Sequence, residues 1–224
     1  MNYYSKEEII MAKRIFVTAT NTDIGKTYTT KLLLKEFASR GLRVGVLKPI
    51  ETGVVDFAPD GDMLLKSIQE LNSEFKPLQR GDIVPIVYEL PAAPFVASNV
   101  VSLDLSKIKS AIEKLEVLCD VLIIEGAGGL YVPIDAETMM IDLIKKLDAV
   151  ALLVTHCSLG CINDTLLSQK ALEDKNIKYT TAFNCRADDE SFEIVSEPYF
   201  LKSGFEVLKV SQDIDTICDV LYNL

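Results

Sequence analysis

The sequence predicts one α/β domain, in which a mostly parallel β-sheet is covered by helices on both faces. Short apolar runs alternate with helical patterns along the chain, as they do in parallel α/β folds. The apolar runs are nearly continuous, which is typical of strands buried on both sides. With 224 residues, of which 49% are hydrophobic, the chain is long enough for one full core. We expect this domain over residues 11–224, with residues 1–10 as an N-terminal extension.

Each element is placed where an apolar run or a helical period begins and ends. Gly41 follows the first helical pattern as a C-terminal cap, and Ile108, Ile112 and Leu115 trace one apolar helix face. Long loops at 49–61 and 126–138 follow strands, at the edge where open α/β sheets bind ligands. The expected strands cover residues 15–18, 44–48, 83–88, 121–125, 150–155, 179–184 and 205–210. The expected helices cover residues 26–39, 62–71, 106–119, 139–147, 163–174 and 213–221.

The first strand leads into a loop with the features of a phosphate site. Residues 18–27 end in Gly25, Lys26 and Thr27 and run directly into the first helix. In such a unit the backbone N–H groups at the helix start point at phosphate oxygens. Gly25 lets the main chain approach closely, Lys26 adds positive charge, and the Thr27 hydroxyl can ligate Mg²⁺. A plain surface turn is the alternative, but the flanking strand and helix favour a nucleotide phosphate loop.

The charge balance argues against several classes of partner. A formal net charge of -10 repels nucleic acid and anionic lipid surfaces. No apolar stretch is long enough to span a bilayer. Glu7 and Glu8 stand where the apolar core of a signal peptide would begin. We therefore expect a cytoplasmic protein that binds neither nucleic acid nor membranes.

The cysteines and the one histidine are interpreted as structural. Five cysteines are an odd number without metal-ligand spacing, so buried apolar thiols in a reducing compartment are favoured over a redox or zinc site. Neighbouring residues usually point apart, so His156 and Cys157 are not expected to form a nucleophile pair. The cysteines are Cys119, Cys157, Cys161, Cys185 and Cys218.

A carboxylate and a lysine follow two of the buried strands. Glu125 ends one of them and precedes the glycine-rich segment 126–129. In phosphate-loop proteins such a carboxylate holds or positions Mg²⁺, and the glycines let the backbone pass close to a phosphate. A solvent-facing acid is the alternative for Glu125. Lys48, ahead of Pro49, can reach the phosphates beside Lys26, although a solvated lysine is the commoner outcome for such a residue alone.

Three further features have both a functional and a structural interpretation. Asp62 begins a helix and is either a second metal carboxylate or a favourable charge at the helix start. Residues 155–164 lead into a helix whose free N–H groups can hold a carboxylate, or form a plain capped loop. Asn184 ends a strand, where its amide can contact a nucleobase or satisfy the turn.

Taken together and in order, these motifs resemble dethiobiotin synthetase. The resemblance extends from about Met11 to Asn184 and rests on residues 18–27, Lys48-Pro49-x-x-Thr52-Gly53, Asp62, 125–129, 159–163 and Asn184. It implies an ATP-dependent, homodimeric enzyme with Mg²⁺ as its cofactor. Such an enzyme makes dethiobiotin from 7,8-diaminopelargonate and CO₂ and releases ADP and phosphate.

The resemblance also implies a role for each matching position. The catalytic residues would be Lys26, Lys48 and Thr52, and the metal ligands Thr27, Asp62 and Glu125. The nucleotide would be bound by Asp23, Ile24, Gly25, Lys26, Thr27, Tyr28, Asp62, Glu125, Gly126, Ala127, Gly128, Asn184 and Cys185. The substrate would be bound by Thr22, Lys48, Thr52, Leu159, Gly160, Cys161, Ile162 and Asn163, with two subunits sharing the site.

Two positions depart from the family pattern. Ala19 replaces the usual loop glycine, where we expect a local adjustment and no loss of binding. Residues 205–213 lack the proline-containing turn that helps to enclose the base, which predicts weak nucleobase selectivity.

A switch ATPase that positions proteins or partitions DNA is the main alternative function, and a non-catalytic binding subunit is another. Switch ATPases often carry a second loop lysine, where this chain has Thr20 and Asn21.

Overall fold

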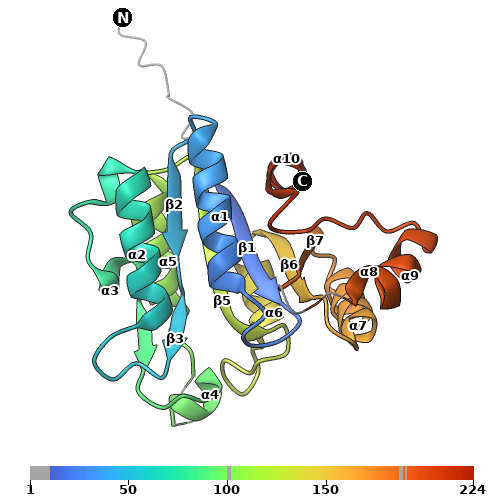
Figure 1. Ribbon diagram of the computed structural model, residues 1–224. Helices are drawn as coiled ribbons and strands as arrows, with labels where there is room; N and C mark the ends of the chain where they lie inside the picture. The colour runs from blue at the N-terminus through green and yellow to red at the C-terminus, as the bar shows by residue number, and fades with distance from the viewer. Residues whose placement is uncertain (1–10, 100–101, 187–188, 190) are drawn as a thin grey trace, which may run out of the picture.

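Five parallel strands form the main sheet of the protein, in the order β2–β5–β1–β6–β7 (Figure 1). The computed structural model describes residues 11–99, 102–186, 189 and 191–224, so the extension expected over residues 1–10 lies outside the described residues. Two short strands, β3 and β4, pair in parallel as a second sheet. The strands are β1 (Lys13–Ala19), β2 (Val44–Leu47), β3 (Ile50–Thr52), β4 (Ile86–Tyr88), β5 (Val121–Gly129), β6 (Val150–His156) and β7 (Tyr179–Asn184).

Helices cover both faces of the main sheet, with α1 in front of it and α5 behind it in Figure 1. This arrangement confirms the expected α/β fold with a mostly parallel sheet. The helices are α1 (Lys26–Ser39), α2 (Pro59–Leu71), α3 (Arg80–Ile83), α4 (Pro94–Ala97), α5 (Leu105–Glu116), α6 (Met140–Lys146), α7 (Cys161–Asp174), α8 (Phe192–Val195), α9 (Glu197–Lys202) and α10 (Ile214–Asn223), with a 3-10 turn η1 (Ser73–Phe75).

The central strands are apolar and buried over their middle residues. Ile15, Phe16 and Val17 of β1 are inaccessible to solvent, as are the first four residues of β5. β1 pairs with β5 on one side and with β6 on the other. Because every strand of this sheet is parallel, the carboxyl ends meet at one edge, where open α/β sheets bind ligands. The loop after β1 and the end of β5 therefore lie side by side.

Two of the expected strands are wrong. Residues 83–88 are split, because α3 ends at Ile83 and β4 begins at Ile86. Pro85 between them has no N–H to donate, and the Asp82 carboxylate accepts a hydrogen bond from the N–H of Gln79, which stabilises the helical turn. Residues 205–210 are not a strand of the sheet. They follow β7 through backbone bonds from Phe183 to Leu208 (2.7 Å) and from Val210 to Phe183 (2.9 Å).

The start of α2 also differs from the expectation. The helix begins at Pro59, ahead of the expected start at Asp62. Proline is favourable in the first turn, because the N–H that it lacks would have no partner there. The sequence pattern places the start too late because the apolar period of this helix begins only with Leu64 and Ile68, which are the buried side chains. The short helices α3, α4, α8 and α9 do not show a helical period at all.

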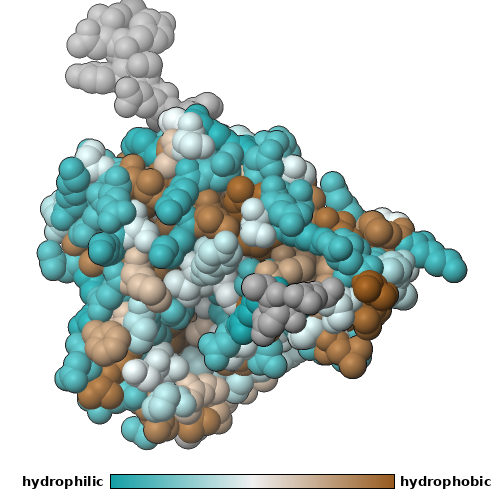
Figure 2. Space-filling model, viewed as in Figure 1, coloured by the Kyte–Doolittle hydropathy of each residue, from teal (hydrophilic) through white to brown (hydrophobic). Residues whose placement is uncertain are grey.

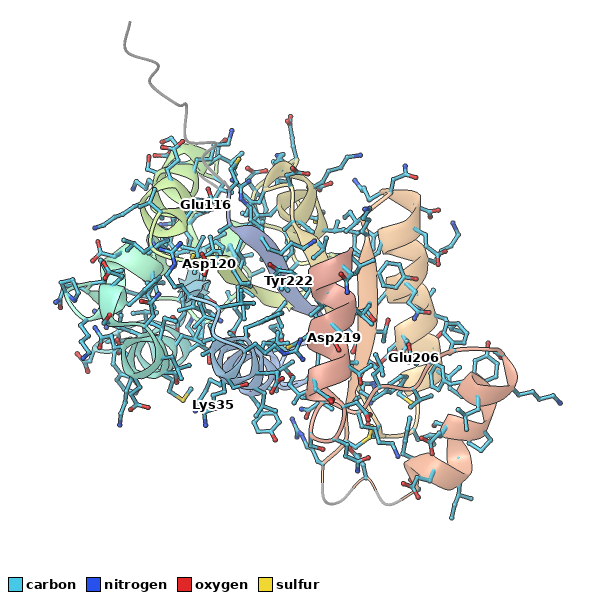
Figure 3. The ribbon with its side chains drawn as sticks, turned by 90° about the horizontal axis from the view of Figure 1, so that it is seen from above. Lys35, Glu116, Asp120, Glu206, Asp219 and Tyr222 are labelled. Carbon is cyan, nitrogen blue, oxygen red and sulfur yellow. A yellow bond between two sulfur atoms is a disulfide. The ribbon has the colours of Figure 1, made fainter. Side chains whose placement is uncertain are left out.

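The amino edge of the sheet and the C-terminal helix are fixed by ion pairs. Tyr222 and Asp219, labelled in Figure 3, lie on α10 and face α1. The Tyr222 ring lies 6.3 Å from that of Phe37, and Asp219 accepts a hydrogen bond from Arg40 at 2.5 Å. Glu116 lies farther along the same edge, where Arg14 donates to it. These contacts are at the opposite end of the strands from the ligand edge.

A second, smaller core lies beyond β7. Phe183, Phe192 and Phe200 pack together there under α8 and α9. Figure 2 shows hydrophobic side chains at the edge formed by these helices, where Ile194 and Leu201 are exposed. Among the described residues, no helix is long and apolar enough to cross a membrane.

Candidate active site

The loop after β1 has a backbone conformation that requires glycine at residue 25. Gly25 has a φ of 103°, which favours glycine, and it caps the start of α1. A Cβ atom on Gly25 would lie only 2.1 Å from Nδ2 of Asn184. That amide donates to the carbonyl of Ile24 at 2.7 Å, so β7 supports the loop from behind. No side chain caps the start of α1, so its first N–H groups are available to an anion.

Ala19 is the last residue of β1 and is fully buried. It pairs with Gly129 of β5 and Val154 of β6, and the register against β5 shifts between Val17 and Ala19, which is the local adjustment expected there. Its φ is not positive, so a glycine has no conformational advantage at this position. The residue that departs from the family pattern therefore lies in the strand β1 and not in the loop before α1.

Four polar side chains from different elements meet beside this loop. Lys48 Nζ lies 2.7 Å from Oε1 of Glu125 and 2.7 Å from Oδ2 of Asp60. The Thr27 hydroxyl lies 2.9 Å from Glu125 Oε1 and 3.1 Å from Asp60 Oδ1, so its one proton can be donated to either. Lys48 and Glu125 are buried, with 3% and 0% of their surface exposed. The segment after β2, the strand β5 and the first turns of α1 and α2 therefore bring together a lysine, two carboxylates and a hydroxyl.

The charges of this cluster are set by burial and by its ion pairs. Burial alone would lower the pKa of Lys48, but the charges of Glu125 and Asp60 and hydrogen bonds to both raise it above its usual value. Burial would raise the pKa of Asp60, but Lys48 and the Thr27 hydrogen bond lower it. Lys26 has a lowered pKa, first because it is buried and then because Lys48 is near. Lys48 is thus held as a cation and Asp60 as an anion.

Asp62 does not reach this cluster. Its carboxylate accepts from the N–H of Ala58 at 3.1 Å and from Arg80 at 3.4 Å. Since α2 begins at Pro59, the residue that projects from its first turn toward Thr27 and Lys48 is Asp60. The prediction that Asp62 faces the site is therefore wrong in position, and Asp60 stands in that place. Asp62 was predicted to face the site because the helix was expected to begin at residue 62, whereas α2 begins at Pro59.

The polar atoms beside Thr27 fit a magnesium ion. Oε2 of Glu125 is buried and, within the described part of the chain, has no hydrogen-bond partner. A buried carboxylate oxygen without a partner is costly unless a cation or donor meets it. The described residues contain no group of three or more His, Cys, Asp and Glu side chains that could hold a metal alone. Mg²⁺ at this position would complete its oxygen shell with the Thr27 hydroxyl, phosphate oxygens and water.

A cavity of about 740 Å³ opens in front of the cluster. This volume is in the usual range for small-molecule sites. Residues predicted from the sequence that line it are Thr22, Asp23, Gly25, Lys26, Thr27, Lys48, Thr52, Ala127 and Gly128. Glu51, Asp60 and Arg186 also line it, although the sequence pattern did not indicate them. The acids at 51 and 60 lie in a segment that was expected to be an irregular loop, where nothing in the pattern indicates which side chains point inward.

Known proteins share both the sequence and the fold of this chain. A family model described as an AAA domain matches residues 13–214. The ATP-dependent dethiobiotin synthetase BioD of Sulfurovum sp. (strain NBC37-1) is 48% identical over 186 residues, which are 83% of this chain and 89% of the relative. The chain belongs to the dethiobiotin synthetase family.

More distant members of the dethiobiotin synthetase family match nearly the full length. The BioD protein of Wolinella succinogenes is 34% identical over 93% of this chain and 98% of its own. That of Methanocaldococcus jannaschii is 36% identical over 91% of each. Among solved structures, the MinD cell division protein of Aquifex aeolicus has a TM-score of 0.54 at 16% identity, covering 95% of this chain and 98% of its own. This likeness shows the fold alone, which is that of P-loop NTPases.

A second cavity lies behind the loop, where the resemblance to dethiobiotin synthetase implies the nucleobase. It has a volume of about 350 Å³ and is lined by Gly25, Tyr28, Asn184, Cys185, Arg186 and Ser211. The Asn184 amide nitrogen is already used by the carbonyl of Ile24, and Arg186 donates to the carbonyl of Asp23. Ser211 comes from the C-terminal stretch that departs from the family pattern. The Asn184 amide nitrogen is therefore engaged in supporting the phosphate loop.

The segment implied to bind the substrate carboxylate is separate from the main cavity within one chain. Leu159 is 84% exposed, and none of the residues 159–163 lines the large cavity. Cys161 is fully buried in the second core, so its side chain faces away from any ligand. His156 lies between the Ser158 hydroxyl (2.6 Å) and the Asp164 carboxylate (3.0 Å), which fixes the loop before α7.

The expectation that every cysteine is a free thiol is wrong. Cys157 and Cys185 are joined by a disulfide, with 4.9 Å between their Cα atoms. Cys119, Cys161 and Cys218 are free and buried, as expected. Since β6 and β7 pair side by side, the residues that follow each strand meet, and the sequence spacing does not show this. The disulfide ties the loop before α7 to the residue after Asn184.

The glycines of β5 have different neighbours from those expected. A Cβ on Gly126 would lie 2.7 Å from the Phe16 ring, so glycine at this position permits close packing against the core. Gly128 has a φ of 65° and lines the large cavity. Gly129 passes close to the backbone of Thr20. Only Gly128 among these three lies where the resemblance implies a nucleotide contact.

Proposed function

We propose that this protein is an ATP-dependent dethiobiotin synthetase, which carboxylates 7,8-diaminopelargonate with CO₂ and closes the ureido ring, releasing ADP and phosphate. The reaction needs Mg²⁺, and the enzyme works in the cytoplasm as a homodimer. The observation that carries this proposal is the meeting of Lys48, Glu125 and Asp60 beside the phosphate loop, in front of a cavity large enough for the substrate. Membership of the dethiobiotin synthetase family supports it.

The chemistry suits a site without a protein nucleophile. One substrate amine adds CO₂ to give a carbamate, whose oxygen takes the γ-phosphoryl group of ATP. The second amine attacks the resulting mixed anhydride and expels phosphate. Phosphoryl transfer depends on positioning and charge neutralisation. Lys26 and Lys48 are lysines that line the cavity beside the loop, and both are buried, where their charges are least screened.

Three side chains are proposed to hold the metal. Thr27, Asp60 and Glu125 present oxygens to one place beside the loop, and Asp60 takes the role that the resemblance gives to Asp62. When bound, Mg²⁺ neutralises the charge that develops on the phosphoryl oxygens. Among the described residues, Oε2 of Glu125 is a buried carboxylate oxygen without a hydrogen-bond partner, which such a cation would satisfy.

The substrate is proposed to lie between two subunits. Thr22 and Thr52 line the large cavity and are placed to contact the amine or carbamate end. Leu159, Gly160 and Asn163 at the start of α7 are exposed and do not line that cavity, so this segment can serve the neighbouring subunit by holding the far carboxylate of the substrate. A fully active monomer in sedimentation at assay concentration would contradict this shared site.

Substrate dependence of ATP cleavage tests the proposal. ADP release should be slow with ATP and Mg²⁺ alone and should rise only when both diaminopelargonate and bicarbonate are added. Omission of either substrate is the control. ATP cleavage that needs a protein or DNA partner would instead indicate a switch ATPase, and no cleavage at all would indicate a binding subunit.

A further inference from the structure

Glu51 is a buried acid that the proposed chemistry does not use. It lies in β3 with 4% of its surface exposed. Oε1 accepts from the N–H of Asp60 and Oε2 from the N–H of Gly61, both at 2.9 Å. Burial raises the pKa of Glu51, and these two hydrogen bonds oppose that shift. A carboxylate with both oxygens bound to backbone N–H groups is a strong, fixed contact.

These bonds give α2 a helix cap from a distant residue. The N-cap residue, Ala58, has no side chain that can accept a hydrogen bond, so the first N–H groups of α2 need another acceptor. Glu51 supplies it from β3. The fit is close, because a Cβ on Gly61 would lie 2.8 Å from Glu51 Oε2 and 2.5 Å from Val84 Cγ2. Glycine at 61 thus allows the helix start to approach the carboxylate.

The residue held in this way is the one that reaches the site. The backbone N–H of Asp60 is bound by Glu51, while its side chain contacts Lys48 at 2.7 Å and Thr27 at 3.1 Å. Asp60 is therefore held at two points, at its backbone N–H by Glu51 of β3 and at its carboxylate by Lys48 and Thr27.

We propose that Glu51 is a positioning residue for the metal site, acting by holding the first turn of α2 so that the Asp60 carboxylate stays beside Thr27. The inference rests on the proposed binding of MgATP by this site. It does not require that the protein make dethiobiotin. Residues that orient a metal-binding side chain typically contribute 10–100-fold in metal affinity or activity.

The test measures how much Mg²⁺ tightens the binding of a non-hydrolysable ATP analogue. For each protein, the Kd of the analogue is determined by calorimetry with Mg²⁺ and with a chelator, and the ratio of the two values is the Mg²⁺ effect. Glu51→Gln leaves one backbone N–H facing an amide NH₂ in place of an oxygen. We expect it to reduce the Mg²⁺ effect by about tenfold, while the Kd without Mg²⁺ is unchanged.

Two further variants separate positioning from a general loss of structure. Asp142→Asn is the matched control, since Asp142 also accepts a backbone N–H at a helix start, that of Met139 at 2.9 Å, but lies outside the site. It should keep the full Mg²⁺ effect. The double variant Glu51→Gln/Asp60→Ala should lose no more than Asp60→Ala alone, because Glu51 acts through Asp60.

Several outcomes would overturn the proposal. One is a full Mg²⁺ effect in folded Glu51→Gln, and another is a double variant in which the two losses multiply. If Glu51→Gln does not fold, Gly61→Ala takes its place, because it displaces the same contact while keeping both oxygens, and an unchanged Mg²⁺ effect in that variant contradicts the positioning role. Because no substrate other than the nucleotide is present, these results are independent of dethiobiotin formation, whose absence would overturn only the proposed function.

Discussion

The ammonium group of Lys48 and the carboxylate of Glu125 form a buried ion pair, with 2.7 Å between Nζ and Oε1. Lys48 is 3% exposed and Glu125 is fully buried. Each charge is costly to bury alone, so each depends on the other, and Asp60 supplies a second negative charge to Lys48. A residue proposed to act on phosphate is therefore also part of the folded framework.

Replacing Lys48 with alanine should lower both the rate and the stability. We expect kcat to fall on the order of a hundredfold or more, because a positioned cation is lost. The free energy of unfolding should fall by about 3 kcal/mol, because Glu125 stays buried without its partner. Steady-state kinetics and urea denaturation measure the two effects. Lys114→Ala is the control, since its pair with Asp82 is exposed and should matter little to either. Near-normal turnover of Lys48→Ala would remove this residue from the catalytic set.

Replacing Gly25 with alanine should abolish nucleotide binding. The change combines an unfavourable positive φ with a clash against the Asn184 amide. Gly41→Ala separates the two effects, because Gly41 also has a positive φ of 83° but a Cβ there meets nothing within 4 Å. Gly41→Ala should cost about 1 kcal/mol of stability and keep full affinity for ATP. Equal ATP affinity in the two variants, measured by calorimetry, would contradict the loop geometry.

Asp60→Asn and Asp62→Asn should behave differently, although the residues are close in sequence. Asp60→Asn weakens the contacts to Lys48 and Thr27, so the Mg²⁺ concentration needed for half-maximal activity should rise at least tenfold. Asp62→Asn changes only contacts with Ala58 and Arg80, and this Mg²⁺ requirement should stay within about twofold. A larger effect of Asp62→Asn would restore the assignment made from the sequence.

The comparison of these two acids shows where sequence reasoning stops. Gly25, Lys26 and Thr27 could be placed because their loop lies between an apolar strand and a helical pattern, and Glu125 because it ends an apolar run. The carboxyl ends of parallel strands share one edge, so these residues were expected to meet there. Asp60 could not be placed, because its position depends on where α2 begins. Proline at 59 favours that start, and Glu51, which is near in space but belongs to a segment without a periodic pattern, accepts the N–H groups of Asp60 and Gly61 there.

The disulfide illustrates the same limit for contacts between strands. Cys157 and Cys185 each follow a strand, but the order of strands in the sheet is needed to see that β6 and β7 are neighbours. The fold class and most strands could be predicted from apolar runs. The order of those strands and the short helices α3, α4, α8 and α9 could not.

Thiol labelling should distinguish the two kinds of cysteine. Alkylation of the denatured protein without reductant should modify Cys119, Cys161 and Cys218 and leave the other two unmodified. Prior reduction should make all five react. Peptide mass spectrometry identifies the modified residues, and the reduced sample is the internal control. Labelling of all five without reductant would show that Cys157 and Cys185 are free thiols.

The most direct test of the account is the fate of labelled bicarbonate. The purified protein is incubated with ATP, Mg²⁺, 7,8-diaminopelargonate and ¹³C-bicarbonate, and the products are analysed by mass spectrometry. The account predicts dethiobiotin with one ¹³C atom, in its ureido carbonyl, and one ADP for each molecule formed. ADP release without labelled dethiobiotin, in the presence of every substrate, would contradict the proposed function.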